Sequence, residues 1–258
     1  MQKNKISHWN KGILIAWFLV AILIASWIIP ITRLFWNYLD AMTYLSLHSF
    51  FLQTDFSQKF WAIMNSRIAD NTSHAIFILI FLRYIFIPNG QLLKKRIFKV
   101  IYVLLAVVLS VLLSKGIQSE ISNHFSIKRD SPSLVLGYDV ALSKVLPGLE
   151  NVKDSSQRSF PGDHAMTLCL LCGFIFWLTR SFFLRSVGLL AMLFFIVPRL
   201  ISGGHWLTDL IMGSFPIAIF ALAMWTSLYA FLEKIFTKKE TLLILKEPHT
   251  KTKTNSGL

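Results

Sequence analysis

The sequence predicts an all-α integral membrane protein, a six-transmembrane-helix bundle with interfacial helices in its outer loops. First, hydrophobic residues make up 54% of the 258 residues and charged residues only 15%, which is too apolar for a soluble domain of this size. Second, the apolar residues gather into runs long enough to cross a hydrocarbon layer. Third, Lys and Arg concentrate in alternate connections between these runs, as they do in multi-pass membrane proteins.

The six expected spans follow one another along the chain. The first begins after Lys3, Lys5 and Lys11 and ends without a small-residue cleavage site, so it is expected to remain as an anchor. The fourth and fifth are the shortest, so their flanking charged residues would have to extend to the interface. The expected spans are residues 12–30, 72–88, 97–114, 164–179, 184–199 and 206–232.

With both ends of the chain inside, three connections lie outside. Residues 31–71 are rich in aromatic side chains but hold no run long enough to span, which predicts interfacial helices along the headgroups. Residues 115–163 form a long polar connection, and residues 200–205 form a short turn. Residues 1–233 are therefore expected to form one membrane domain, and residues 234–258 a basic, disordered cytoplasmic tail.

The net charge of +13 does not indicate a nucleic-acid partner. The excess of Lys and Arg lies in the parts assigned to the cytoplasmic side, so the charge follows the topology. The two cysteines, Cys169 and Cys172, lie inside the fourth span. We expect them to pack as small apolar residues rather than to form a redox pair or a metal site.

Two histidine motifs indicate phosphate chemistry at a membrane surface. Arg199, His205 and Asp209 form the pattern Arg-x5-His-x3-Asp, and His164 ends the tetrapeptide Pro-Gly-Asp-His. Histidine can attack phosphorus or move a proton near neutral pH, and arginine matches a tetrahedral phosphate with a planar fork of donors. If His205 lies on a helix, Asp209 lies one turn further along the same face, where it can hold the far ring nitrogen.

The predicted topology brings these groups to one face of the membrane. Spans three to six all have an end on the outer side, so their end residues can converge on one pocket. A change of one in the number of spans would send the groups to opposite faces. The residues expected at this face are Lys115, Lys128, Arg129, Arg158, His164, Arg199, His205 and Asp209.

These motifs resemble those of the type 2 phosphatidic acid phosphatase superfamily, membrane phosphotransferases with the patterns Lys-x6-Arg-Pro, Pro-Ser-Gly-His and Ser-Arg-x5-His-x3-Asp. The third pattern matches except that Pro198 replaces its Ser. The resemblance implies that His205 is the nucleophile and forms a phosphohistidine, and that Asp209 orients it. It also implies that His164 is the general acid that protonates the departing oxygen.

The other two motifs depart from the family pattern. Gly162 and Asp163 replace Ser-Gly in the second; Gly162 can still offer a backbone N–H to phosphate, and Asp163 is expected to cap the helix or anchor a hydrogen bond. In the first, Ser122 stands where the Arg after Lys115 is expected, so that spacing fails. Phosphate clamping is assigned instead to Lys128, Arg129 and Arg199, with Lys115 and Arg158 as further candidates.

An alternative for Lys128 and Arg129 is that they are solvated charges of a loop. Fixed cations in the remaining positions would still stand where Mg²⁺ stands in other phosphoryl-transfer enzymes. The Asp and Glu residues also show no spacing typical of metal ligands. We therefore expect neither a metal nor another cofactor.

A wider set of residues resembles the lipid A 1-diphosphate synthase branch of this superfamily, from about Ser26 to Ser214. The branch implies transfer of phosphate from undecaprenyl diphosphate to the 1-phosphate of lipid A, at the periplasmic face of the bacterial inner membrane. The residues that carry this resemblance are Lys128-Arg129-x-Ser131-Pro132, Ser159-Phe160-Pro161-Gly162-Asp163-His164, Pro198-Arg199 and Gly204-His205-Trp206-x-Thr208-Asp209, with Ser26-Trp27, Pro30, Asn65-x-Arg67 and Asp70.

Two other functions fit the same residues. A lipid phosphatase would hand the phosphoryl group to water, with undecaprenyl diphosphate, phosphatidylglycerol phosphate or lipid A 1-phosphate as substrate. A non-catalytic lipid-phosphate binder or transporter would use the cations alone, and the altered first motif is its best support. The expected partners are therefore lipid phosphates and the membrane, with no nucleic acid, and the sequence leaves the oligomeric state open.

Overall fold

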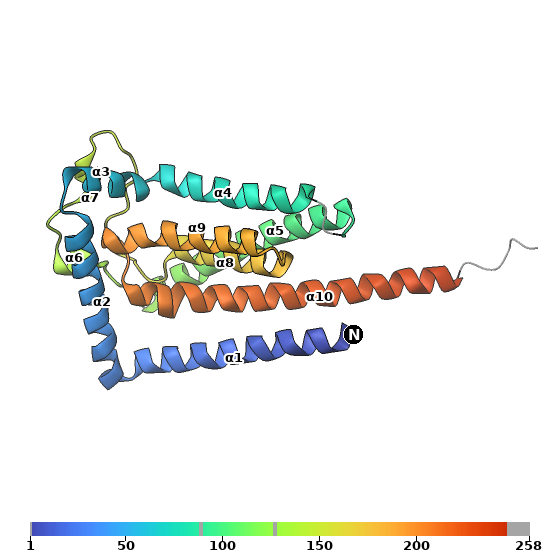
Figure 1. Cartoon of the computed structure of the whole chain (residues 1–258). Coiled ribbons are helices and arrows are strands. Elements are labelled where there is room, and N and C mark those ends of the chain that lie inside the picture. Colours follow the sequence, from blue (N-terminus) through green and yellow to red (C-terminus); the bar gives the residue numbers. More distant parts are fainter. Residues whose placement is uncertain (1, 88–89, 126–127, 247–258) are drawn as a thin grey trace, which may run out of the picture. The chain divides into compact units, whose positions relative to one another are not determined.

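The computed structural model describes residues 2–87, 90–125 and 128–246, and this part of the chain is helical without a strand. The chain divides into two compact units, Met1–Leu222 and Ala223–Leu258, and the site described below lies in the first. The helices are α1 (Gln2–Ile28), α2 (Pro30–Phe51), α3 (Asp55–Met64), α4 (Arg67–Phe86), α5 (Leu93–Phe125), α6 (Pro132–Leu136), α7 (Leu142–Val145), α8 (Asp163–Leu178), α9 (Phe182–Ile201), the π-helix η1 (Asp209–Ser214) and α10 (Phe215–Lys246) (Figure 1).

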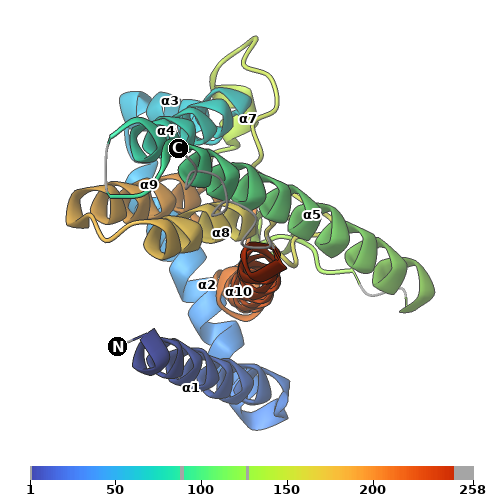
Figure 2. The ribbon, with the colours of Figure 1, turned by 90° about the vertical axis from the view of Figure 1, so that its right-hand side faces the viewer.

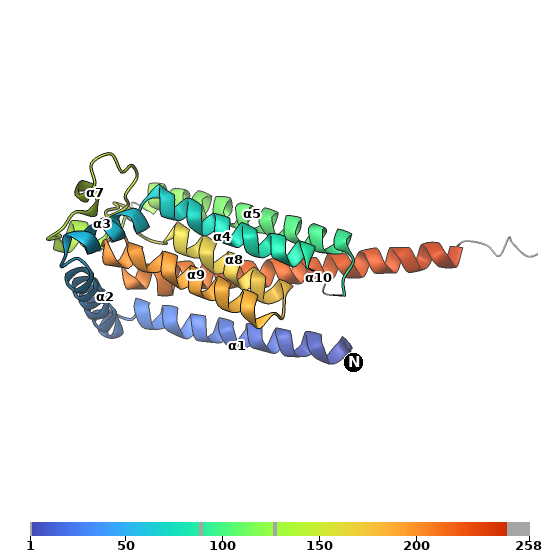
Figure 3. The same ribbon diagram turned by 45° about the horizontal axis from the view of Figure 1, so that its top comes forward.

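Four helices, α4, α5, α8 and α9, form the bundle that carries the site. The helices α4 and α8 each contact both α5 and α9, and the views show the four side by side (Figures 1 and 2). Their buried interior includes Phe77, Val103, Leu168 and Phe174. Because neighbouring helices run in opposite directions, the starts of α4 and α8 lie at the same end as the last turns of α5 and α9 (Figure 3).

The outward faces of the bundle remain apolar. Leu79 on α4, Leu105 on α5 and Leu190 on α9 are all exposed, together with many other large hydrophobic side chains. A soluble monomer rarely exposes so much contiguous apolar surface, whereas a lipid-facing helix does so along its length. The exposure therefore agrees with a membrane protein.

The number of spans differs from the six predicted. Among the described residues, four helices are long and apolar enough to cross a membrane: α4, most of α5, α9, and the helix over Asp209–Ile235. The helix α1 qualifies only together with α2, from which it is bent by 93°, so the count is four or five. The predicted span 164–179 corresponds to α8, whose 16 residues give about 24 Å of helix against roughly 30 Å of hydrocarbon. Six full spans are therefore not confirmed. An apolar run in the sequence predicts a helix, but it does not predict whether that helix crosses the whole hydrocarbon layer.

The connection over residues 31–71 is helical, and its turns carry the expected signals. Pro30 opens α2 after an extended Ile29, which fits its fixed φ and missing N–H. The side chain of Thr54 accepts a hydrogen bond at the start of α3, and the side chain of Ser66 accepts one at the start of α4. The predicted helices are thus present, and their place at the headgroups stays a prediction.

The helix α2 crosses the end of the bundle at an angle and is tied to it by polar contacts (Figures 1 and 3). The Tyr44 hydroxyl donates to the Gly137 carbonyl at 2.7 Å. The Nδ1 atom of His48 lies 3.1 Å from the Ile201 carbonyl oxygen, and its Nε2 accepts from the Val140 N–H at 3.4 Å. An aromatic, interfacial segment therefore also serves as a support for the connections around the site.

The last helix continues past the predicted domain boundary at residue 233. The helix α10 ends at Lys246, so the first part of the segment expected to be a disordered tail is helical. Residues 247–258 lie outside the described residues.

Candidate active site

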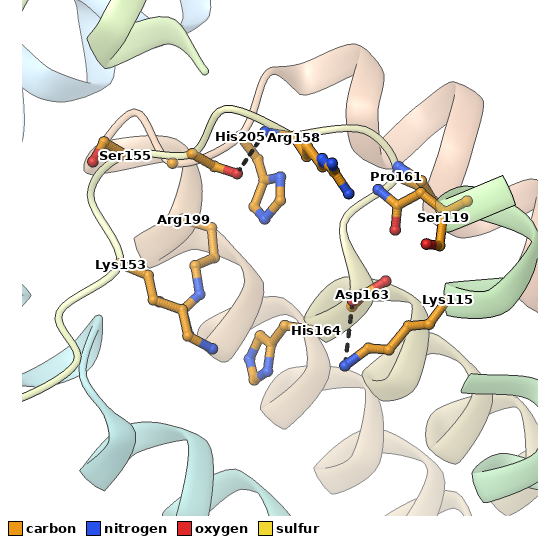
Figure 4. Close-up of a pocket in the computed structure, with 13 residues that line it drawn as sticks. Lys115, Ser119, Lys153, Ser155, Arg158, Pro161, Asp163, His164, Arg199 and His205 are labelled. Atoms are coloured by element: carbon orange, nitrogen blue, oxygen red, sulfur yellow. Dashed lines mark hydrogen bonds and ion pairs between the residues drawn. The ribbon is translucent and has the colours of Figure 1, made fainter. Parts of the chain in front are cut away.

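A pocket of about 370 Å³ lies where α5, α8 and α9 meet the connection that leads into α8 (Figure 4). Five of the residues that the sequence predicts for the site line this pocket together: Lys115, Arg158, His164, Arg199 and His205. Figure 4 shows the two imidazoles between two basic groups, with Arg199 and Lys153 on one side and Arg158 and Lys115 on the other. The pocket therefore combines two proton-carrying rings with several cations.

His205 lies in the bend before the last membrane helix, not on a helix. Its Nδ1 atom is 2.7 Å from the carbonyl oxygen of Ser159. Because a carbonyl can only accept, Nδ1 carries a proton and donates it. The other ring nitrogen, Nε2, then keeps its lone pair, which is the form a nucleophile needs. Ser159 is itself held, since its N–H donates to the Arg129 carbonyl at 2.8 Å.

Asp209 lies behind the His205 ring and is completely buried. Its Oδ2 atom is 3.6 Å from Nδ1 of His205, which is beyond hydrogen-bond distance, and accepts the Trp206 N–H at 2.8 Å. Asp209 also begins the π-helix η1, a form of helix that often occurs at functional sites. The carbonyl of Ser159 thus orients the ring directly, while Asp209 acts on it by its negative charge.

Arg129, which the sequence assigns to phosphate clamping, does not line the pocket. Its NH2 atom donates to Asp40 at 2.7 Å, and its NH1 atom donates to the Thr208 hydroxyl at 2.8 Å and to Asp209. Asp40, only 1% exposed, also accepts the Thr208 N–H and hydroxyl. Two buried carboxylates, those of Asp40 and Asp209, therefore accept hydrogen bonds from N–H groups that a phosphate ligand of Arg129 would need.

Arg199 is buried at the last turn of α9 and does line the pocket. Its NH1 atom donates to the backbone and side-chain oxygens of Asn65 at 2.9 and 2.6 Å, and its NH2 atom donates to Asp70 at 2.6 Å. These bonds use part of the guanidinium and fix its plane. A guanidinium has five N–H donors, so others remain for a phosphate.

Asp70, at the start of α4, links three groups of the pocket. Its Oδ1 atom accepts from Arg199 and lies 3.4 Å from Nδ1 of His164, and its Oδ2 atom lies 3.3 Å from Nζ of Lys153. Burial and the charge of Arg199 lower the pKa of His164 to about 4, and the Asp70 carboxylate opposes this shift. A bound phosphate would add further negative charge and favour the protonated ring, which is the form that a general acid needs.

The other predicted phosphate ligands differ in position. Lys115 reaches the pocket and lies 3.5 Å from the carboxylate of Asp163, and Arg158 lines the pocket from the connection before α8. Lys128 is exposed and does not line the pocket. Gly162 lies beside the His205 ring, since a Cβ atom there would be 3.6 Å from Cε1 of His205.

Sequence reasoning missed four residues: Asp40, Asn65, Asp70 and Lys153. The resemblance to the lipid A 1-diphosphate synthase branch included Asn65 and Asp70 but gave them no role. Asp40 lies within an aromatic interfacial segment, and Lys153 within a polar loop. Neither carries a local pattern that would distinguish it from an ordinary surface charge.

The turn before His205 leaves no room for a side chain at Gly204. A Cβ atom there would lie 2.8 Å from the Lys153 carbonyl oxygen, a backbone atom. We expect Gly204→Ala to displace His205 and to lower kcat/KM by about tenfold to a hundredfold. Gly116→Ala is the control, because a Cβ atom on this helical glycine meets nothing within 4 Å. Steady-state kinetics of both variants tests this; equal activities would contradict it.

Comparisons with known proteins agree with this geometry. The sequence model of the PAP2 superfamily matches residues 103–234. The chain is 30% identical over 234 residues to the Lipid A 1-diphosphate synthase of Escherichia coli (strain K12), and the match covers 90% of this chain and 93% of that protein. No solved structure gives a significant match. The family match includes His164, Arg199, His205 and Asp209, while Asp40, Asn65 and Asp70 lie outside it.

Proposed function

Because the chain belongs to the PAP2 superfamily, it is a phosphatase or phosphotransferase of lipid phosphates, and we propose that it transfers a phosphoryl group from undecaprenyl diphosphate to lipid A 1-phosphate. The observation that carries the proposal is a His205 ring with Nδ1 bonded to a carbonyl and Nε2 left as a nucleophile, in one pocket with His164 and Arg199. The similarity to a lipid A 1-diphosphate synthase supports the choice of donor and acceptor.

The proposed reaction has two steps. Nε2 of His205 attacks the terminal phosphorus of the donor, an N–P bond forms, and the P–O bond to the leaving lipid phosphate breaks. His164 gives its proton to the leaving oxygen, and Arg199 stabilises the charge on the equatorial oxygens. The acceptor phosphate then gives a proton to His164 and attacks the phosphohistidine, and the N–P bond breaks, so that His164 is restored. His205 returns to its starting form.

Asp209 stabilises the charge that develops on the His205 ring during the first step. As Nε2 attacks, the ring becomes positively charged, and Asp209 at 3.6 Å stabilises that charge. Arg129 forms an ion pair with the fully buried Asp209 carboxylate and supplies the opposite charge that such a position needs. Arg129 therefore acts in this proposal as a support for the nucleophile and not as a phosphate ligand.

The proposed location is the bacterial inner membrane, with the pocket on the periplasmic side. Both lipids would lie with their chains in the bilayer and their phosphates in the pocket. The positively charged connections at the opposite ends of the helices support this orientation.

One observation favours the alternative of a lipid phosphatase. The side chains of Lys115 and Lys153 are 56% and 57% exposed, so water has access to the edge of the pocket. Water could then attack the phosphohistidine, with His164 accepting its proton. The same residues would serve both reactions, and the acceptor alone would decide between them.

An assay with donor labelled at its terminal phosphorus separates the two functions. Purified protein in mixed micelles is given this donor with lipid A that carries a 1-phosphate, and in a parallel sample with lipid A that lacks it. We expect label in lipid A in the first sample only, because the acceptor oxygen belongs to the 1-phosphate. Label found only as free phosphate in both samples would reject the transferase and leave the phosphatase.

A further inference from the structure

In the proposed mechanism the same phosphorus atom is attacked twice, first by His205 and then by the acceptor, and the pocket must accommodate both steps. In phosphoryl transfer the attacking and leaving groups stand roughly in line, on opposite sides of the phosphorus. If His205 occupies one side in both steps, the leaving lipid phosphate and the incoming acceptor must use the same position on the other side. That position lies beside His164, which handles the proton at the leaving oxygen. It must therefore bind a phosphate monoester twice in each cycle.

Lys153 is the cation that extends toward this position. Figure 4 shows its side chain directed toward His164, and both residues line the pocket. Its Nζ lies 3.3 Å from Oδ2 of Asp70, while Oδ1 of the same carboxylate is 3.4 Å from His164. With 57% of its side chain exposed, the amine can leave Asp70 and reach a phosphate. The family patterns assign nothing to this residue.

The backbone of Lys153 is fixed, although its side chain is largely exposed. Its N–H donates to the Asn65 carbonyl at 3.1 Å, and its own carbonyl accepts from Nδ2 of Asn65 at 2.7 Å and from the Ser202 hydroxyl at 3.2 Å. Asn65 and Ser202 are both buried. Gly204 allows this approach, since a Cβ there would be 2.8 Å from the same carbonyl oxygen. Such anchoring fits a preorganised ligand.

We propose that Lys153 forms, beside His164, a subsite for a phosphate monoester, and that this subsite directs the phosphoryl group to a phosphate acceptor rather than to water. The inference rests on the proposed phosphohistidine mechanism. An anionic acceptor must approach an anionic phosphohistidine, and a cation between them reduces that repulsion. Water is neutral and needs no such cation. Loss of Lys153 therefore slows transfer more than hydrolysis.

The Lys153→Met variant tests this with the labelled donor and lipid A 1-phosphate. The measured quantity is the ratio of label in lipid A to label in free phosphate. We expect the ratio to fall about tenfold or more, because a charge-assisted hydrogen bond to the acceptor phosphate is lost from transfer only, whereas any effect on the first step is common to both reactions and cancels in the ratio. Lys153→Arg should restore most of the ratio. Lys144→Met, on the same connection but outside the pocket, should leave it unchanged.

A second measurement tests the subsite even if the protein only hydrolyses its donor. The leaving lipid monophosphate would bind the same subsite as a product inhibitor, so its inhibition constant should rise about tenfold in Lys153→Met. An unchanged inhibition constant, or equal loss of transfer and hydrolysis, would overturn the inference. Absence of transfer in the unmodified protein would reject only the transferase, provided that the inhibition constant still depends on Lys153.

Discussion

The His205→Ala variant is expected to lose activity by at least about three orders of magnitude, because it removes the Nε2 atom that attacks phosphorus. His205→Asn is the sharper form of the same test. Its side-chain amide can still donate to the Ser159 carbonyl, which Nδ1 of His205 contacts at 2.7 Å, but it offers no nucleophile. Both variants should be equally inactive and should remain folded.

Trapping of the intermediate gives the direct measurement. The protein is mixed with labelled donor, denatured in alkali, in which a phosphohistidine survives, and counted for bound label. We expect label in the unmodified protein and none in His205→Ala or His205→Asn. His74→Ala serves as the control, since His74 is exposed and does not line the pocket. Label retained after loss of His205 would assign the nucleophile to another residue.

The second large effect is on stability. Arg129→Met is expected to destabilise the protein by about 3–5 kcal/mol, because it leaves two buried carboxylates without their cation. Those carboxylates are Asp40, 1% exposed, and Asp209, which is fully buried. Thermal unfolding in detergent measures the change, and the activity should fall with it.

The neighbouring Lys128→Met variant is the matched control. It removes the same charge one residue earlier, but Lys128 is exposed and lies outside the pocket, so its effect should stay within about 0.5 kcal/mol. Adding Asp40→Asn to Arg129→Met should recover part of the loss, because it removes one of the stranded charges. If Arg129→Met is instead stable but binds donor poorly, Arg129 is a phosphate ligand as the motif suggested.

The positions of the central site residues were predictable, because they depend on which side of the membrane each helix end lies and on short spacings within the sequence motifs. His164, Arg199 and His205 each lie next to an apolar run, and counting those runs placed all three at one end of the bundle, where the pocket brings them together. This placement depends on the alternating direction of successive helices and not on each helix crossing the full hydrocarbon layer. The helix α8 is too short for a full span, yet its first turn still presents His164 at the right end.

The supports of the site were not predictable in the same way. Asp40 pairs with Thr208 and Arg129, which lie 168 and 89 residues further along the chain, and Asp70 pairs with Arg199, 129 residues further along. For a single carboxylate on a helix such as α2, no spacing pattern in the sequence predicts which distant residue it will contact. For Arg129, the motif identified a cation near the site but not the two buried acids that it contacts.

The distance along the chain between Asp40 and its partners has a consequence for biosynthesis. Asp40 leaves the ribosome 168 residues before Thr208. Its cation, Arg129, follows after 89 residues, and until then this carboxylate must stay solvated, because enclosing it alone would be costly. Thr208 and Asp209 complete the cluster only when the start of the last helix has been made. The nucleophile's surroundings can therefore close only around a finished chain, so incomplete copies should be unable to cleave lipids in the membrane that receives them.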